Sequence, residues 1–184
     1  MRDIKNLKVK LNEIPQGGLE LHYSTSSHEL DCALFDLLGE TPIYKVDLLL
    51  SHLDSVTQLK GSISATVTHS CSRCAEDFQS PLNKKFTTVY SKSEEGIKTL
   101  SDGLDDLQGS FDIEFITGNE LDVGEVVHEQ IAIDIPFQPL CSEDCKGLCP
   151  QCGANLNTEE PHAHSESEDK TDSPFAKLKV LRGE

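Results

Sequence analysis

The chain has 184 residues, of which 36% are apolar and 5% aromatic, and its formal net charge is −16. This length suits one hydrophobic core with a small appendage, and the negative charge argues against a protein that clamps nucleic acid through a general positive surface. No stretch approaches the roughly eighteen apolar residues of a membrane span, and the N-terminus shows no apolar targeting segment. We therefore expect a soluble cytoplasmic protein with no membrane partner.

The first forty residues predict two short strands and a helix. Apolar residues alternate with polar ones over 7–11 and again over 19–23, with a turn at 15–18, which predicts an opening pair of strands. Ser26 and Glu29 form a capping-box pattern ahead of leucines at helical spacing, so a helix of about three turns should follow and end near Gly39. Cys32 falls inside this helix and is expected to be a buried, inert thiol.

The stretch 43–90 has the period of two that is typical of strands. Three runs each place apolar or β-favouring residues on one face: Tyr44, Val46, Leu48 and Leu50; Ile63, Ala65 and Val67; Leu82, Phe86, Thr88 and Tyr90. This pattern predicts an antiparallel sheet with one face in solvent. Alternation over 111–115 suggests one more strand.

Acidic residues dominate 91–125, and 91–110 looks like a polar loop. A solvated face is the default interpretation of such a run. The alternative is a docking surface for a basic partner, and its candidate residues are Asp102, Asp105, Asp106, Asp112 and Glu114.

A second capping box, Asp122 with Glu125, opens a helix that Pro136 should end. The fold class is therefore α+β: an antiparallel sheet, open or barrel-like, with a few packed helices and a cysteine-rich C-terminal segment. We divide the chain into a core at 1–136, the cysteine-rich segment at 137–157, a flexible acidic linker at 158–172, and a short amphipathic helix at 173–184.

Six cysteines are clustered in a way that a hydrophobic core does not require. Four of them fall within a dozen residues, and an upstream pair lies at the expected hairpin between the second and third strand runs: Cys141, Cys145, Cys149 and Cys152; Cys71 and Cys74. Two Cys-x-x-Cys turns in a reducing compartment indicate structural zinc sites rather than disulfides. A thioredoxin-like pair would need a strand before the motif and a helix after it, and Cys71 lies between two strand-like runs instead.

The six cysteines, together with His162 and His164 as further candidates, could fill one or two four-coordinate sites. One pairing joins the upstream pair to Cys149 and Cys152, and leaves Cys141 and Cys145 with the histidines. The other keeps the four downstream cysteines together and gives the histidines to the upstream pair. In either case the ion would be structural, because no position stays open for an activated water.

The order of these motifs resembles that of the YceD family of bacterial and plastid proteins. The likeness runs from about residue 43 to the end and is carried by Cys71-Ser-Arg-Cys74, the helix Leu121-Asp-Val-Gly-Glu-Val-Val-His-Glu-Gln-Ile131, Cys145-Lys-Gly-Leu-Cys149-Pro-Gln-Cys152-Gly-Ala-Asn-Leu-Asn157, and Ser173-Pro-Phe-Ala-Lys-Leu178. Many relatives carry a further Cys-x-Cys where this chain has His162-Ala-His164, so the site there would be a mixed one or would be lost. Other relatives lack the 141–152 cluster.

The resemblance implies a non-enzymatic role in accumulation or assembly of the large ribosomal subunit. The expected partner is a basic ribosomal protein, an rRNA precursor, or both, with no small-molecule substrate. Two other functions remain open from the residues: a zinc-stabilised interaction module outside ribosome biology, and a thiol oxidoreductase that uses Cys71 and Cys74.

Overall fold

A computed structural model gives the fold of the chain and describes residues 7–94, 112–158 and 164. The helices and strands of these residues, in chain order, are β1 (Lys8–Lys10), the 3-10 helix η1 (Leu11–Glu13), β2 (Leu19–Ser24), α1 (Phe35–Leu38), β3 (Ile43–Leu53), β4 (Val56–Ser70), β5 (Asp77–Ser91), β6 (Asp112–Phe115), β7 (Glu120–Asp122) and α3 (Val123–Asp134).

The main sheet has five strands in the order β2-β3-β4-β5-β6. The first four run antiparallel to their neighbours, while β6 pairs with β5 in parallel. Strands β2 and β6 are the two edges of this sheet, so the barrel-like option is wrong. The fully antiparallel pairing is also wrong for β6, because β6 runs in the same direction as β5.

The predicted alternation is confirmed along the three long strands. Alternate residues of β3 from Tyr44 to Leu50 are at most 3% exposed, and Ile63 and Val67 of β4 are each 1% exposed. The partners across the ladder match this burial, since Val46 faces Ile63. One face of the sheet is therefore the core face. At Gly61 a Cβ atom would lie 2.3 Å from the Phe86 ring, so glycine there lets that ring cross the strand.

Helix α3 covers the core face and begins where the capping box predicts. The Asp122 carboxylate accepts hydrogen bonds from the backbone N–H of Gly124 (2.9 Å) and of Glu125 (3.2 Å). The helix buries Val127 and Ile131 completely and packs against β5, β1 and α1. It ends at Asp134, two residues before Pro136, and so directs the chain toward the cysteine-rich segment.

Three expectations for the first forty residues are wrong. The two opening strands do not pair with each other, because β1 pairs with β7 and β2 pairs with β3. Only Phe35–Leu38 is α-helical, since His28 has a φ of 55°, which a right-handed helix cannot contain. Leu30, Leu34 and Leu38 are still buried, with Leu38 in α1 and the other two in the irregular segment before it. Cys32 is exposed rather than buried.

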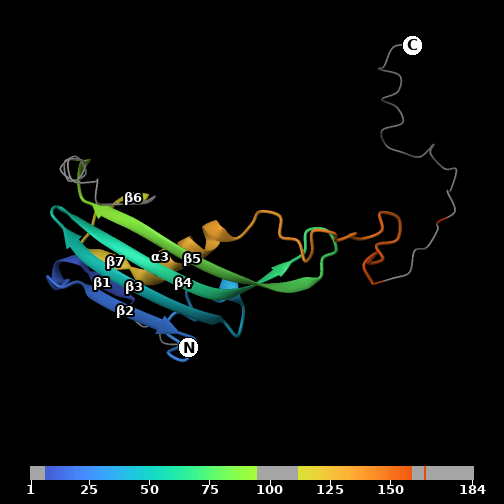
Figure 1. The fold of residues 1–184 in the computed structure, drawn as a ribbon, viewed down its shortest axis with the longest axis horizontal. Coiled ribbons are helices and arrows are strands. Elements are labelled where there is room, and N and C mark those ends of the chain that lie inside the picture. Colours follow the sequence, from blue (N-terminus) through green and yellow to red (C-terminus); the bar gives the residue numbers. More distant parts are fainter. Residues whose placement is uncertain (1–6, 95–111, 159–163, 165–184) are drawn as a thin grey trace, which may run out of the picture.

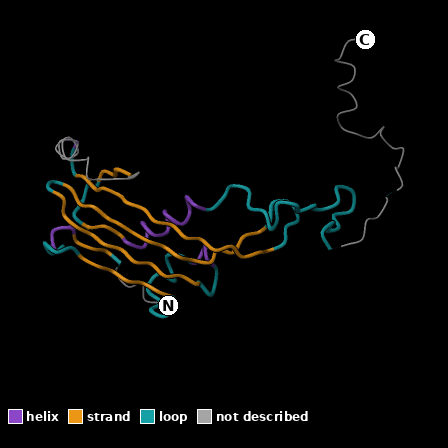
Figure 2. Tube along the Cα trace, viewed as in Figure 1, coloured by secondary structure: helices purple, strands orange, loops and turns teal. Residues whose placement is uncertain are grey.

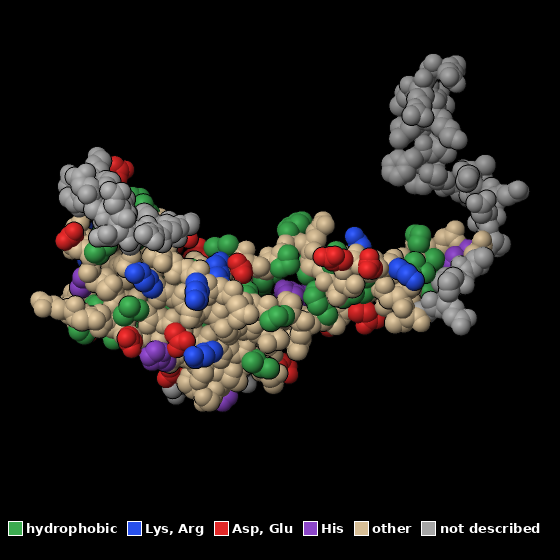
Figure 3. All heavy atoms as spheres, in the orientation of Figure 1, with side chains coloured by type: hydrophobic (Ala, Val, Ile, Leu, Met, Phe, Trp, Pro, Cys, Tyr) green, Lys and Arg blue, Asp and Glu red, His purple; other side chains and the backbone are tan. Residues whose placement is uncertain are grey.

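The β4–β5 hairpin extends beyond the rest of the sheet and carries the cysteine-rich segment with it. In Figure 1 this segment continues the long axis of the molecule, and Figure 2 shows it as loops. Figure 3 shows a narrow arm with acidic and basic side chains on its surface. The arm is defined here as residues 71–76 with 137–158. The predicted linker and terminal helix lie outside the described residues except at Thr158 and His164.

No helix in the described part of the chain is long and apolar enough to cross a membrane.

Candidate metal centre

The tip of the β4–β5 hairpin is a six-residue turn, residues 71–76, that carries Cys71 and Cys74. The last strand pair is Ser70 with Asp77. Beyond it, the Cys71 N–H donates to the Glu76 carbonyl and the Ala75 N–H donates to the Cys71 carbonyl, both over 2.9 Å. Ala75 has a φ of 58°, in the left-handed region. The position predicted for this Cys-x-x-Cys turn is confirmed.

The segment after α3 folds back along this tip and is held there by its backbone. The Ser72 N–H donates to the Pro139 carbonyl (2.9 Å), and the Leu148 N–H donates to the Arg73 carbonyl (3.1 Å). The Arg73 guanidinium donates in turn to the Cys145 carbonyl (3.0 Å). Gly147 has a φ of 74°, and a Cβ there would lie 3.0 Å from the Arg73 carbonyl oxygen. These contacts bring Cys141 and Cys145 to the upstream pair.

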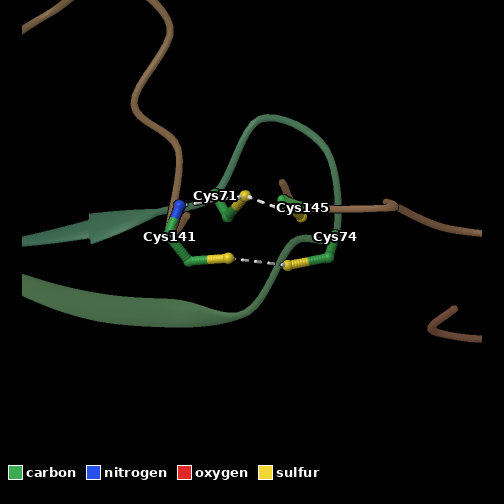
Figure 4. A group of neighbouring side chains, drawn as sticks. All are labelled: Cys71, Cys74, Cys141 and Cys145. Carbon is green, nitrogen blue, oxygen red and sulfur yellow. Dashed lines mark hydrogen bonds between the residues drawn. The ribbon is translucent and has the colours of Figure 1, made fainter. Parts of the chain in front are cut away.

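Four sulfurs from the two segments form one cluster (Figure 4). The Sγ atoms of Cys71 and Cys145 are 3.8 Å apart, and those of Cys74 and Cys141 are 3.7 Å apart. All four lie within 4.8 Å of one another. A zinc ion bound tetrahedrally at about 2.3 Å from each sulfur requires sulfur–sulfur distances of about 3.8 Å, whereas a disulfide requires about 2.05 Å. The cluster therefore has the dimensions of a four-thiolate metal site.

Hydrogen-bond donors favour the thiolate at two of the four cysteines, Cys71 and Cys145. The Cys141 N–H donates to the Cys71 sulfur over 3.4 Å, and this bond is the main reason that the pKa of Cys71 falls to about 6. Burial raises the pKa of Cys145, but the Asn157 amide and the Gly147 N–H offset this, and the net direction is downward. The neighbouring Cys145 sulfur instead raises the pKa of Cys141 to about 12. Four thiolates at this spacing therefore need a cation to share their charge.

The cluster is largely closed to solvent. Cys71, Cys74 and Cys145 are 2%, 3% and 5% exposed, and the apolar side chains packed on them are Phe78 and Leu140. Four protein ligands would fill a tetrahedral ion, which is the arrangement of a structural site rather than a hydrolytic one.

A second, smaller group lies farther along the arm. Cys149, Cys152 and His164 place their ligand atoms within 4.8 Å of one another, with the Cys149 sulfur 3.2 Å from His164 Nε2. His162, the other candidate ligand, lies outside the described residues. Both groups could hold metal ions.

The grouping differs from both pairings predicted from the sequence. The upstream pair meets Cys141 and Cys145, not Cys149 and Cys152 and not the histidines. The reason is the return of 139–148 along the hairpin, which no local pattern shows. Sequence reasoning also missed Asn157, whose side-chain amide donates to the Cys145 sulfur over 3.3 Å. The Asn-Leu-Asn motif after Gly153 was the available signal.

The predicted acidic face is only partly within the described residues. Asp102, Asp105 and Asp106 lie outside them. Asp112 and Glu114 lie on β6, and Asp112 is exposed while Glu114 is half-buried. Burial raises the pKa of Glu114, and the charges of Glu129 on α3 and of Asp112 raise it further. The negative charges of Asp112 and Glu129 therefore act unfavourably on the Glu114 carboxylate.

The family model of the large ribosomal RNA subunit accumulation protein YceD matches residues 59–182. This chain belongs to the YceD family. The matched region begins in β4 and contains all six clustered cysteines, so the predicted resemblance is confirmed over most of the chain.

Curated relatives of this YceD chain are found in mycobacteria and in plants. An uncharacterised protein of Mycobacterium bovis is 22% identical over 175 residues, which cover 95% of this chain and 79% of that protein. The maize protein named large ribosomal RNA subunit accumulation protein YCED homolog 1, chloroplastic, is 27% identical over 121 residues, 55% of this chain and 41% of its own. The Arabidopsis thaliana protein of the same name is 32% identical over 60 residues, 33% of this chain and 19% of its own. No solved structure matches the chain.

Proposed function

We propose that this protein is a non-enzymatic factor required for accumulation of large-subunit ribosomal RNA, and that it acts by binding a component of the forming large subunit. The observation that carries this proposal is the YceD match over residues 59–182. The names of the maize and Arabidopsis relatives, which describe accumulation of the same RNA, support it.

We further propose that zinc occupies the four-sulfur cluster and has a structural role. Among the described residues, hydrogen bonds hold the arm on the hairpin, but the apolar packing on its three buried cysteines is small and consists of Phe78 and Leu140. A structural zinc ion contributes on the order of 10 kcal/mol to folding. Such an ion would hold residues 139–148 on the hairpin and so give the arm one fixed surface.

We propose a basic ribosomal protein as the direct partner. The net charge of −16 disfavours a general grip on RNA phosphates. The negative potential around Asp112, Glu114 and Glu129 suits lysine and arginine side chains. Direct binding to an rRNA precursor is the competing outcome of a pull-down that compares ribosomal proteins with rRNA.

The decisive experiment is depletion of the protein in its own cells, followed by the ratio of large-subunit to small-subunit rRNA and a gradient profile of ribosomal particles. We expect a selective loss of large subunits that the wild-type chain restores. A complementing Cys74→Ser, Cys141→Ser chain should restore less, while Cys32→Ser, outside both clusters, should restore fully. An unchanged rRNA ratio on depletion would overturn the proposed function.

One observation favours a second function, thiol oxidoreduction by Cys71 and Cys74. The pKa of Cys71 falls to about 6, and a low pKa favours a reactive thiolate as well as a metal ligand. The two functions differ in one readout. A redox pair forms an intramolecular Cys71–Cys74 disulfide under mild oxidation, whereas a zinc-filled cluster stays reduced until the metal is removed.

A further inference from the structure

The second Cys-x-x-Cys turn repeats two backbone hydrogen bonds and one left-handed residue of the first. The Cys149 N–H donates to the Ala154 carbonyl over 2.7 Å, and the Gly153 N–H donates to the Cys149 carbonyl over 2.8 Å. These are the same two bonds, at the same spacing, that shape the turn from Cys71 to Glu76. The fifth residue is left-handed in both turns, with a φ of 77° at Gly153. The second turn is therefore built to direct two sulfurs to one ion.

His164 adds a third ligand atom to this turn. Its Nε2 is 3.2 Å from the Cys149 sulfur, and all three ligand atoms are within 4.8 Å. Zinc at about 2.3 Å from sulfur and about 2.0 Å from imidazole nitrogen requires a sulfur–nitrogen distance of about 3.5 Å. Two thiolates and an imidazole form a ligand set that suits zinc or cobalt.

The two clusters differ in exposure. Three of the four ligands in the first are at most 5% exposed, while in the second Cys149 is 9% exposed and both Cys152 and His164 are exposed. With three described ligands and greater access to water, the second group should release a metal ion more readily than the first.

The chain that leaves the second turn runs directly onto the first cluster. The Leu156 N–H donates to the Gly147 carbonyl (2.9 Å), and Asn155 donates to the Glu76 carboxylate (3.3 Å). Asn157 then donates its side-chain amide to the Cys145 sulfur, and its own oxygen accepts from the Lys146 N–H (2.8 Å). Only four residues lie between Cys152 and Asn157, so order in the second turn sets the position of this donor.

We propose that Cys149, Cys152 and His164 form a second zinc site that exchanges its ion more readily than the four-sulfur site. Occupancy of this second site strengthens metal binding at the first, because it fixes Asn157 on the Cys145 sulfur. This coupling rests on zinc in the four-sulfur site, whereas the second site stands on its own geometry. The arm then carries two ions of unequal affinity, and loss of the weaker one loosens the stronger one.

The test uses cobalt as the probe on the full reduced chain after chelation and dialysis without oxygen. The number of bound equivalents is measured together with the sulfur-to-cobalt charge-transfer absorption, whose intensity grows with the number of thiolate ligands. We expect two equivalents, the first with a four-thiolate spectrum and the second with a two-thiolate spectrum. Cys149→Ser, Cys152→Ser should bind one equivalent with the four-thiolate spectrum. Cys32→Ser is the control and should bind two.

Asn157→Ala tests the coupling with every ligand left in place. Loss of a hydrogen bond to a ligand sulfur should weaken the four-sulfur site roughly tenfold. It should also shift the charge-transfer band of that site to lower energy, because an N–H donor stabilises the sulfur electrons. General loosening of the arm would not shift the band. The Cys149→Ser, Cys152→Ser variant should show the same weakening of metal binding at the four-sulfur site.

Each contrary result overturns a different part of the proposal. A wild-type chain that binds one equivalent with a four-thiolate spectrum excludes the second site and leaves the first intact. If the wild-type chain binds two equivalents, but the first-site affinity is unchanged in both Asn157→Ala and the Cys149→Ser, Cys152→Ser variant, the coupling is excluded. A wild-type chain that binds no cobalt excludes both the second site and the structural metal of the proposed function, whereas the rRNA ratio in depleted cells tests the ribosomal role separately.

Discussion

The sulfurs of Cys74 and Cys141 lie 3.7 Å apart, although the two residues are 67 positions apart in the chain. Between them the chain completes β5 and β6 and passes through α3. The cluster therefore joins two segments that are distant in the chain and depends on long-range contacts. Metal binding at this site should report on completed folding of the arm rather than on an early local turn.

Removal of the metal should loosen the arm and spare the sheet. The sheet core has its own buried residues, including Val46, Ile63 and Ile131, which do not touch the cysteines. We expect a strong chelator to open 137–158 to limited proteolysis while the far-ultraviolet circular dichroism of the sheet is retained. Zinc added back should restore protection. Cooperative loss of all strands on chelation would contradict an independent core.

Gly147→Ala should weaken the four-sulfur site without changing any ligand. A left-handed φ costs an alanine about 1–2 kcal/mol, and its Cβ would press on the Arg73 backbone oxygen at 3.0 Å. We expect roughly a tenfold loss of cobalt affinity, measured by competition with a chelator. Gly17→Ala is the matched control, because nothing lies within 4 Å of its Cβ. Equal affinities in the two variants would show that the Arg73 contact does not hold the segment.

Glu114→Gln should stabilise the free protein at neutral pH. Burial and the charges of Glu129 and Asp112 raise the pKa of Glu114 in the folded state. A carboxyl with a raised folded pKa holds its proton longer when folded, so stability falls as the pH rises through the unfolded value near about 4.3 and levels off above the folded value. The glutamine side chain does not titrate, so Glu114→Gln should not lose folding stability in this way. The measurement is urea unfolding from pH 4 to pH 7.

Glu40→Gln, at an exposed position, serves as the control and should leave the pH profile of Glu114 intact. If Glu114→Gln shows the wild-type pH profile, the surroundings of Glu114 do not raise its pKa in the folded state. The repulsion from Glu129 and Asp112 is then weaker than we infer.

Charge reversal at Asp112 and Glu129 should abolish binding of a basic ribosomal protein. Both side chains are exposed, and their charges act on Glu114 between them. We expect the wild-type interaction to weaken with salt, as steering by opposite charges does. Pull-down of purified large-subunit proteins, and separately of large-subunit rRNA, with wild type, Asp112→Lys with Glu129→Lys, and Glu40→Lys as control would measure it. Unchanged protein binding, or a complex with rRNA alone, would exclude the ribosomal protein as partner.

The sequence predicts what depends on periodicity and local turn chemistry. The buried faces of β3 and β4, the Asp122 cap and the Cys71–Cys74 hairpin turn follow such rules, and the structure confirms them. The helix expected after Ser26 fails because His28 takes a left-handed φ. The ligand grouping fails because it depends on how 139–148 returns along the hairpin. That return depends on Arg73 and Gly147, whose contacts are long-range and leave no periodic trace.

Thiol labelling should separate the zinc-bound arm from a redox pair. Cys32 is exposed and lies in neither cluster, while the six remaining cysteines belong to the two groups. We expect iodoacetamide to modify the zinc-loaded chain mainly at Cys32, although Cys141 and Cys152 are also exposed, because a metal-bound thiolate is shielded from alkylation. After chelation all seven should react, with Cys71 early because its pKa lies at about 6. Rapid labelling of Cys71 while zinc is bound would instead favour the oxidoreductase.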